Sequence, residues 1–149
     1  MGIMDHRLRL TSVVLAGLGL LDSAYLSYVK LINSKVFCGG SNQCETVNNS
    51  PYSEIAGIPI AYLGLGAYLV LGLLLIWETR SRFLGQNGPL IIFGLSLTGV
   101  IYSAYLTYIE IAVLHAICPY CVVSAIVITF IFIISIVRLG SDRSKLSVN

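Results

Sequence analysis

Charged side chains are scarce in this chain: Asp, Glu, Lys and Arg together make up 11% of its 149 residues, whereas 56% are hydrophobic. A water-soluble domain usually carries roughly 25% charged residues, so the shortfall excludes a chain that is surrounded mainly by water. The formal net charge of +2 is also too small to indicate a nucleic-acid partner. Membrane lipid is therefore the expected surrounding.

Four apolar segments dominate the sequence, and each has about the 20 residues that a membrane-spanning helix needs. A polar loop rich in turn-forming residues separates the first segment from the second. These features predict an all-α fold, an integral membrane four-helix bundle with a long outer loop, residues 33–54, between helices 1 and 2. We expect one membrane domain over residues 1–149, without a thioredoxin-like domain, and with spans at residues 10–32, 55–77, 89–111 and 117–138.

The basic residues predict how the spans are oriented, because short cytoplasmic loops carry an excess of Lys and Arg. If both termini are cytoplasmic, only Lys30 and Lys35 lie outside, and seven basic residues lie inside: Arg7, Arg9, Arg80, Arg82, Arg138, Arg143 and Lys145. Residues 78–88 then form an inner polar connector. Pro89 is predicted to occupy the first turn of the third helix, where a missing N–H is tolerated.

The chain has four cysteines, in two close pairs: Cys38 with Cys44, and Cys118 with Cys121. The predicted topology brings both pairs to the outer face, where disulfides form readily. A Cys-x-x-Cys sequence at a helix N-terminus favours redox chemistry, because the helix dipole stabilises a thiolate on the first cysteine. The alternatives are static disulfides in a structural or transport bundle, or a four-cysteine metal site. Five residues separate Cys38 from Cys44, which fits zinc ligation poorly, so no metal site is predicted.

Two segments, residues 21–31 and 101–111, are similar at a constant offset of 80 residues, with five of the eleven positions identical. The same offset relates Cys38 to Cys118. Helices 1 and 3 are therefore predicted to be parallel copies that each rise to the outer face and lead to a cysteine. The alternative is chance similarity between helix ends, because Tyr is common at membrane interfaces.

Together these residues give the chain a family resemblance. It resembles the vitamin K epoxide reductase family, in its bacterial quinone-linked disulfide-forming branch, over residues 10–138. The matching residues are the two cysteine pairs, Ser50 with Pro51, the run Gly57-Ile58-Pro59, and Cys118-Pro119-Tyr120-Cys121. Ala125 stands where vertebrate members carry a Tyr of the vitamin K and anticoagulant pocket, so the resemblance does not extend to epoxide reduction or anticoagulant sensitivity.

The resemblance implies a membrane thiol–disulfide oxidoreductase that supports disulfide formation in exported proteins. Its expected cofactor is a quinone (ubiquinone, menaquinone or phylloquinone) near Cys121, with Ser50 in the wall of the site. Its expected partner is a thioredoxin-like (DsbA-like) protein in the periplasm or another extracytoplasmic space. Electrons would enter at the Cys38–Cys44 pair, pass from Cys44 to Cys118, and leave from Cys121. The expected location is the bacterial cytoplasmic membrane, with the cysteines on the outer face.

Three further polar residues are weaker candidates. Asp22 is a carboxylate inside the first span and is a functional candidate for that reason, although it lies far from the cysteine face. His115 precedes Cys118 and is a candidate proton donor to the quinone, or else a residue of the membrane interface. Glu110 is interpreted only as part of the polar break between the third and fourth spans.

Overall fold

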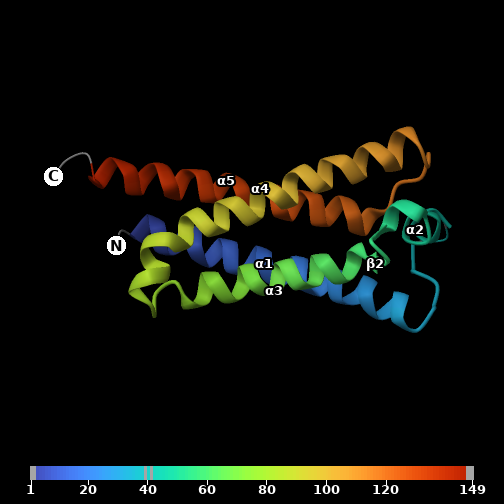
Figure 1. Ribbon diagram of the computed structural model, residues 1–149, viewed down its shortest axis with the longest axis horizontal. Helices are drawn as coiled ribbons and strands as arrows, with labels where there is room; N and C mark the ends of the chain where they lie inside the picture. Colours follow the sequence, from blue (N-terminus) through green and yellow to red (C-terminus); the bar gives the residue numbers. More distant parts are fainter. Residues whose placement is uncertain (1–2, 39, 41, 147–149) are drawn as a thin grey trace.

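Helices make up nearly all of the protein, as the sequence predicts. The computed structural model describes residues 3–38, 40 and 42–146. Its long helices are α1 (Ile3–Leu31), α3 (Ile60–Trp77), α4 (Arg82–Ala112) and α5 (Pro119–Leu146) (Figure 1). Each of these four helices contains a segment long and apolar enough to cross a membrane. The all-α, multi-pass membrane fold is therefore confirmed.

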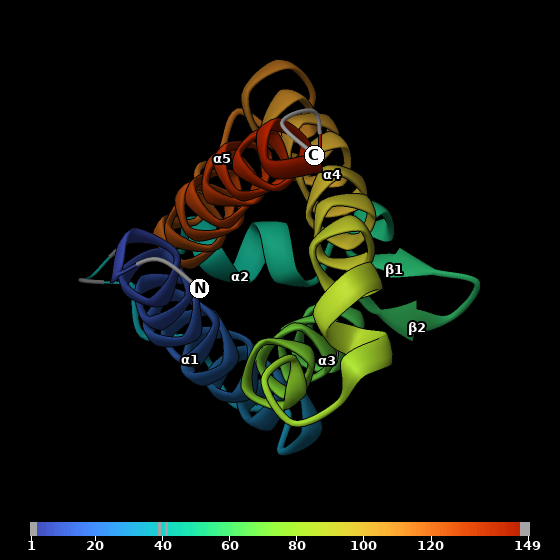
Figure 2. The ribbon, with the colours of Figure 1, turned by 90° about the vertical axis from the view of Figure 1, so that its left-hand side faces the viewer.

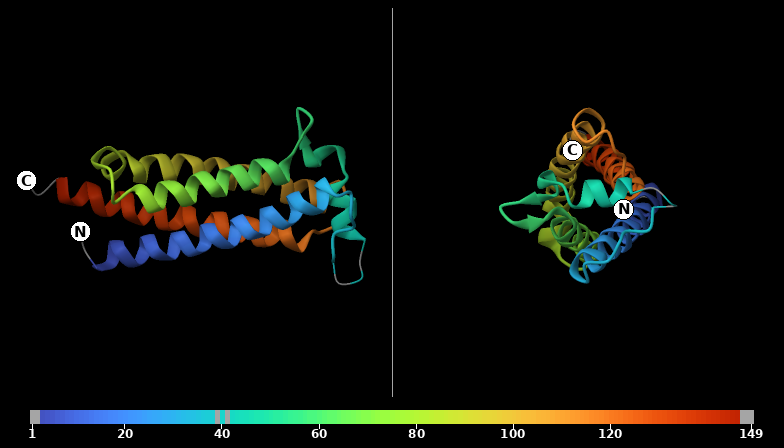
Figure 3. Two further views of the ribbon diagram at one scale, coloured as in Figure 1. Left: turned by 90° about the horizontal axis from the view of Figure 1, so that it is seen from below. Right: turned by 90° about the vertical axis from the view of Figure 1, so that its right-hand side faces the viewer.

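The four long helices run side by side as a bundle. Helix α1 packs against α3 and α5, and α4 packs against α5 and α3. Viewed along the bundle, the four helices form the sides of a diamond (Figure 2). The start of α1 and the end of α5 lie at one end of the bundle, and the segment between α1 and α3 covers the other end (Figure 3).

The segment between α1 and α3 has more regular structure than a simple loop. It contains α2 (Gln43–Asn48), the 3₁₀ helix η1 (Pro51–Ser53), and an antiparallel pair of short strands, β1 (Glu54–Ile55) and β2 (Ile58–Pro59). Gly57 has a φ of 81°, which a tight turn between the strands requires and which glycine adopts without strain. Helix α2 lies across the end of the bundle (Figure 3).

Helix α4 begins earlier than the sequence predicts. Pro89 lies inside α4, which begins at Arg82, so the expectation that Pro89 occupies the first turn is wrong. Proline removes one helical hydrogen bond, but the helix continues on both sides of it, as membrane helices often do when neighbouring helices support them. Much of the predicted connector, residues 78–88, is consequently helical.

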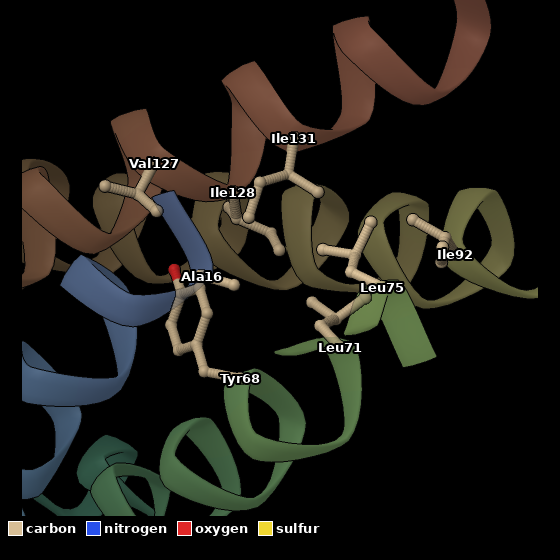
Figure 4. Packing of buried hydrophobic residues seen from close by; sticks show 8 residues of the cluster. All are labelled: Ala16, Tyr68, Leu71, Leu75, Ile92, Val127, Ile128 and Ile131. Carbon is tan, nitrogen blue, oxygen red and sulfur yellow. The ribbon is translucent and has the colours of Figure 1, made fainter. Parts of the chain in front are cut away.

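The middle of the bundle holds an apolar core centred on Tyr68, Leu71, Leu75 and Ile131, which are all buried (Figure 4). The Tyr68 hydroxyl group donates a hydrogen bond to the backbone oxygen of Ser124, at 2.9 Å. Gly19 is required beside this ring, because a Cβ atom at that position would collide with the Tyr68 side chain. Small residues thus allow α1 and α3 to approach closely, as is common between helices in lipid.

A buried ionic cluster closes the end of the bundle that holds the chain termini. Arg138 on α5 donates hydrogen bonds to Glu78 Oε1 at 2.6 Å and to Asp5 Oδ1 at 2.9 Å. The side chains of Arg138 and Glu78 are each only 4% exposed. This cluster joins α1, α5 and the C-terminal end of α3, at the end away from the cysteines (Figure 1).

Candidate functional site

All four cysteines meet at one end of the bundle. Cys38 and Cys44 form a disulfide, with their Cα atoms 6.1 Å apart, and Cys118 and Cys121 are free thiols. Cys44 and Cys118 are both buried and belong to one hydrophobic cluster, against which Cys38 and Cys121 also pack. The structure therefore brings together two pairs that are separated by about half of the chain, one oxidised and one reduced.

Two tyrosines hold the backbone next to Cys38. Tyr25 on α1 and Tyr120 on α5 have ring centroids 5.2 Å apart. The Phe37 N–H donates to the Tyr25 hydroxyl at 3.3 Å, and the Tyr120 hydroxyl donates to the Phe37 backbone oxygen at 3.0 Å. Both backbone polar groups of Phe37 are thus bonded to the bundle, which fixes the approach to Cys38. Tyr25 belongs to the repeated sequence and Tyr120 to the Cys-x-x-Cys motif.

The other end of α2 is also tied to the bundle. Lys30, near the end of α1, donates to the Asn48 backbone oxygen at 2.8 Å and forms an ion pair with Glu54 at 3.6 Å. The Asn48 oxygen is a natural acceptor because it lies at the C-terminal end of α2, where the last carbonyls have no helical partner. Cys44 is held on α2 between these two attachments.

Cys118 directly precedes Pro119, the first residue of α5. A hydrogen bond with the Cys121 thiol lowers the pKa of Cys118, and the backbone N–H groups of Cys121 and Tyr120 act in the same direction. Burial and the nearby Glu110 carboxylate oppose this effect. The net lowering makes Cys118 the more readily ionised thiol of the pair, which is the usual arrangement when the first cysteine of Cys-x-x-Cys lies at a helix N-terminus.

Glu110 is a buried member of the site that the sequence interpretation missed. Its side chain is 3% exposed, and its Oε2 atom accepts a hydrogen bond from the Cys118 N–H at 3.2 Å. The carboxylate is also hydrogen-bonded to the Cys121 thiol. Its second oxygen, Oε1, is buried with no hydrogen-bond partner. The signal was present in the sequence as an acidic residue eight positions before Cys118, at the end of an apolar helix.

A cavity adjoins the free thiols. Its atom-free space is about 480 Å³, part of which is open to the surroundings. Cys118, Cys121, Glu110 and Ser50 contribute to its wall, and the rest of the lining is mainly apolar and includes Leu26, Leu106 and Ile109. The Ser50 hydroxyl donates to the Val47 backbone oxygen at 2.8 Å, which stabilises the turn after α2. A largely apolar cavity with a few polar groups is typical of a small-molecule site.

The two other polar candidates lie apart from this cavity wall. His115 is exposed and adopts a φ of 49° in the turn between α4 and α5. Asp22 is half-buried within α1, and its Oδ2 atom is buried without a partner. Neither residue contributes to the cavity lining beside the free thiols.

These features define a helical membrane protein with two cysteine pairs in one cluster beside a cavity. A family model of the vitamin K epoxide reductase family matches residues 10–136, and the chain belongs to this family. It is also similar to the thiol-disulfide oxidoreductase LTO1 of Arabidopsis thaliana, with 34% identity over 129 residues. That match covers 78% of this chain and 33% of the relative, so the chain spans about a third of the length of that protein.

Proposed function

We propose that this protein is a membrane thiol–disulfide oxidoreductase that takes electrons from a thiol partner and passes them through two cysteine pairs to a quinone. The observation that carries the proposal is the shared cluster of Cys38, Cys44, Cys118 and Cys121 next to a cavity. Membership of the family and the name of the Arabidopsis relative support the thiol–disulfide chemistry. The quinone and the partner are the finer parts of the proposal.

The exposure of the sulfurs supports an order for the exchange. Cys38 is only half-buried, whereas Cys44 is fully buried, so a reduced partner attacks Cys38 and releases Cys44 as a thiolate. Cys44 then attacks Cys118 of an oxidised Cys118–Cys121 pair, and Cys121 leaves. The partner's second thiol attacks its own sulfur in the mixed disulfide and releases Cys38 as a thiolate. Attack of Cys38 on Cys44 then restores the first disulfide and releases Cys118. The partner has then lost two electrons, and the Cys118–Cys121 pair has gained them.

The cavity residues suit a quinone. Apolar side chains, among them Leu26, Leu106 and Ile109, would hold its ring, and Ser50 and Glu110 are the polar groups nearest the free thiols. The unpartnered Oε1 atom of Glu110 is a buried polar atom that a bound polar group would satisfy. A bound quinone supplies the two-electron acceptor that reoxidises the pair. Ubiquinone, menaquinone and phylloquinone all have this chemistry.

The proposed partner is a thioredoxin-like (DsbA-like) protein in the periplasm or another extracytoplasmic space. Its reduced cysteines would reach the half-buried Cys38, and the product would be an oxidant for exported proteins. The proposed location is a bacterial cytoplasmic membrane, with both chain ends in the cytoplasm and the cysteines outside, in line with the distribution of Lys and Arg. Residues 1–149 would act as a single membrane domain.

The proposal is tested by separating the two pairs. The double variant Cys38→Ser/Cys44→Ser should lose quinone-dependent oxidation of a reduced thioredoxin-like protein but should still oxidise dithiothreitol, because a small dithiol reaches Cys118–Cys121 without the first pair. The matched variant Cys118→Ser/Cys121→Ser should lose both activities. Replacing the cysteines of a pair together avoids leaving one thiol that could form an unwanted disulfide with the other pair.

Purified protein with a short-chain ubiquinone or menaquinone is sufficient for these measurements. Absence of quinone-dependent thiol oxidation by the wild-type protein would overturn the proposed function. If both double variants lost both activities equally, the first pair would not be a relay, and two structural disulfides would be the better explanation.

A further inference from the structure

We infer that Glu110 is the acid–base residue of the site, which gives a proton to Cys121 when that sulfur leaves the disulfide and takes it back when the pair is reoxidised. This inference deepens the proposed function and rests on it. Its basis is the position of one buried carboxylate, which touches both cysteines of the free pair and lines the cavity beside them.

The environment of Glu110 differs from that of a residue that merely ends a helix. An acidic residue in the last turn of a membrane helix normally reaches water, but this side chain is 3% exposed. It also lies at the C-terminal end of α4, where the helix dipole disfavours negative charge. The compensation comes from α5, through the Cys118 N–H and the Cys121 thiol. Glu110 is therefore held in position by the two residues whose redox state changes.

Oxidation or reduction of the Cys118–Cys121 pair changes how many hydrogen-bond donors face the Glu110 carboxylate. In the reduced pair, the Cys121 thiol carries one proton, which it can donate to the carboxylate or to the Cys118 sulfur. In the disulfide, Cys121 has no proton to donate, and the carboxylate keeps only the Cys118 N–H as a donor. A buried carboxylate with fewer donors is stabilised by taking up a proton. The oxidised pair should therefore be accompanied by a protonated Glu110, and the reduced pair by an ionised one.

Proton exchange between Glu110 and Cys121 accounts for the protons in both redox steps. When Cys44 attacks Cys118, protonated Glu110 gives its proton to the departing Cys121 sulfur, so that Cys121 leaves as a thiol. On reoxidation, the Cys118 thiolate and the Cys121 thiol form the disulfide and give up two electrons to the quinone. The Cys121 proton passes to Glu110 and stays there, and the two protons of the quinol come from water. Glu110 is then protonated again, as at the start of the cycle.

The test is redox-induced infrared difference spectroscopy on protein freed of quinone. The double variant Cys38→Ser/Cys44→Ser is used, so that only Cys118 and Cys121 change redox state when the sample is reduced and reoxidised with dithiothreitol and its disulfide. The oxidised protein should show the C=O stretch of a protonated carboxylic acid, which shifts in D₂O. Adding Glu110→Gln should remove this band, whereas adding Asp22→Asn, at a half-buried carboxylate of α1 that does not line the cavity, should leave it.

Glu110→Gln keeps an amide oxygen for the Cys118 N–H but cannot exchange a carboxyl proton. In the otherwise wild-type protein it should lower quinone-dependent dithiothreitol oxidation by about 10²- to 10⁴-fold, the usual range for loss of general acid–base catalysis. Glu110→Asp should recover part of this loss. Unchanged turnover in Glu110→Gln would overturn the inference, and so would a carboxylic acid band that is absent from the parent or persists in that variant.

The infrared measurement needs neither quinone nor partner, so it still reports on Glu110 if the proposed quinone reaction fails. Thermal unfolding of each variant separates loss of folding from loss of proton transfer. If Glu110→Gln does not fold, Glu110→Asp serves in its place, and its carboxylic acid band should appear at a shifted frequency. A band at the unchanged frequency in the Asp variant would show that another residue carries the proton.

Discussion

Removing Arg138 is expected to destabilise the protein strongly, although this residue lies at the end of the bundle away from the cysteines. Arg138→Met would leave the Glu78 carboxylate, which is 4% exposed, without its 2.6 Å hydrogen-bond partner. Breaking a buried ion pair by removing one partner costs about 3–5 kcal/mol. Asp5 also loses a bond, but its side chain is 25% exposed and can be solvated, so Glu78 dominates the cost.

A double-mutant cycle isolates this cost. Adding Glu78→Gln to Arg138→Met removes the stranded charge, so the double variant should recover most of the loss and lie within about 2 kcal/mol of the wild type. The assay is reversible unfolding in mixed detergent micelles, followed by circular dichroism with the Cys38–Cys44 disulfide intact. Arg80→Met, at an exposed position, is the matched control and should shift the unfolding free energy by less than about 0.5 kcal/mol. Equal destabilisation in Arg138→Met and in the double variant would refute the reasoning.

Three further predictions concern the cysteine end. Cys121→Ser should trap a Cys44–Cys118 disulfide, detectable by mass spectrometry of non-reduced peptides; a dominant Cys38–Cys118 link would reverse the relay order. Because the pKa of Cys118 is lowered, chiefly by the Cys121 thiol, its alkylation by iodoacetamide should persist to a lower pH than for a free cysteine with a pKa of about 8.5. Cys121→Ala should move that profile to higher pH, and an unmoved profile would contradict the assigned cause. In intact cells, a single cysteine at position 42 should react with an impermeant maleimide and one at position 79 should not; the opposite pattern would invert the topology.

Much of the architecture is predictable from the sequence because lipid imposes a simple pattern. The four apolar segments indicate the helices, and the spacing of Cys118 and Cys121 indicates a dithiol at a helix end. Pro89 is misleading, because proline favours a helix start but does not prevent a membrane helix from beginning earlier. Helix α2 was also not predicted, since its six residues are held by tertiary contacts such as the bond from Lys30 rather than by a strong local pattern.

The residues that sequence reasoning missed are those whose role depends on burial. Glu110 stands at the end of an apolar segment, where an acidic residue usually faces headgroups or water, and only the packing of α4 against α5 reveals that it meets both free thiols. From the sequence, Arg138 is one of the basic residues expected on the inner side, and residue 78 belongs to the predicted connector. In the structure, Arg138 and Glu78 form a buried pair, although 60 positions separate them. Pairing across such separations cannot be read from local periodicity.

The burial of the sulfurs gives the proposed relay a direction. Each pair has one inner sulfur, Cys44 or Cys118, which is buried, and one outer sulfur, Cys38 or Cys121, which is only half-buried. The two inner sulfurs share one apolar cluster, so the proposed exchange between the pairs would take place in a buried setting. The outer sulfurs lie at different boundaries, since Cys121 lines the cavity and Cys38 does not. In the proposed relay, a partner thiol would enter at Cys38 and a quinone would meet the second pair at the cavity, so the two would have separate points of access joined by the exchange between Cys44 and Cys118.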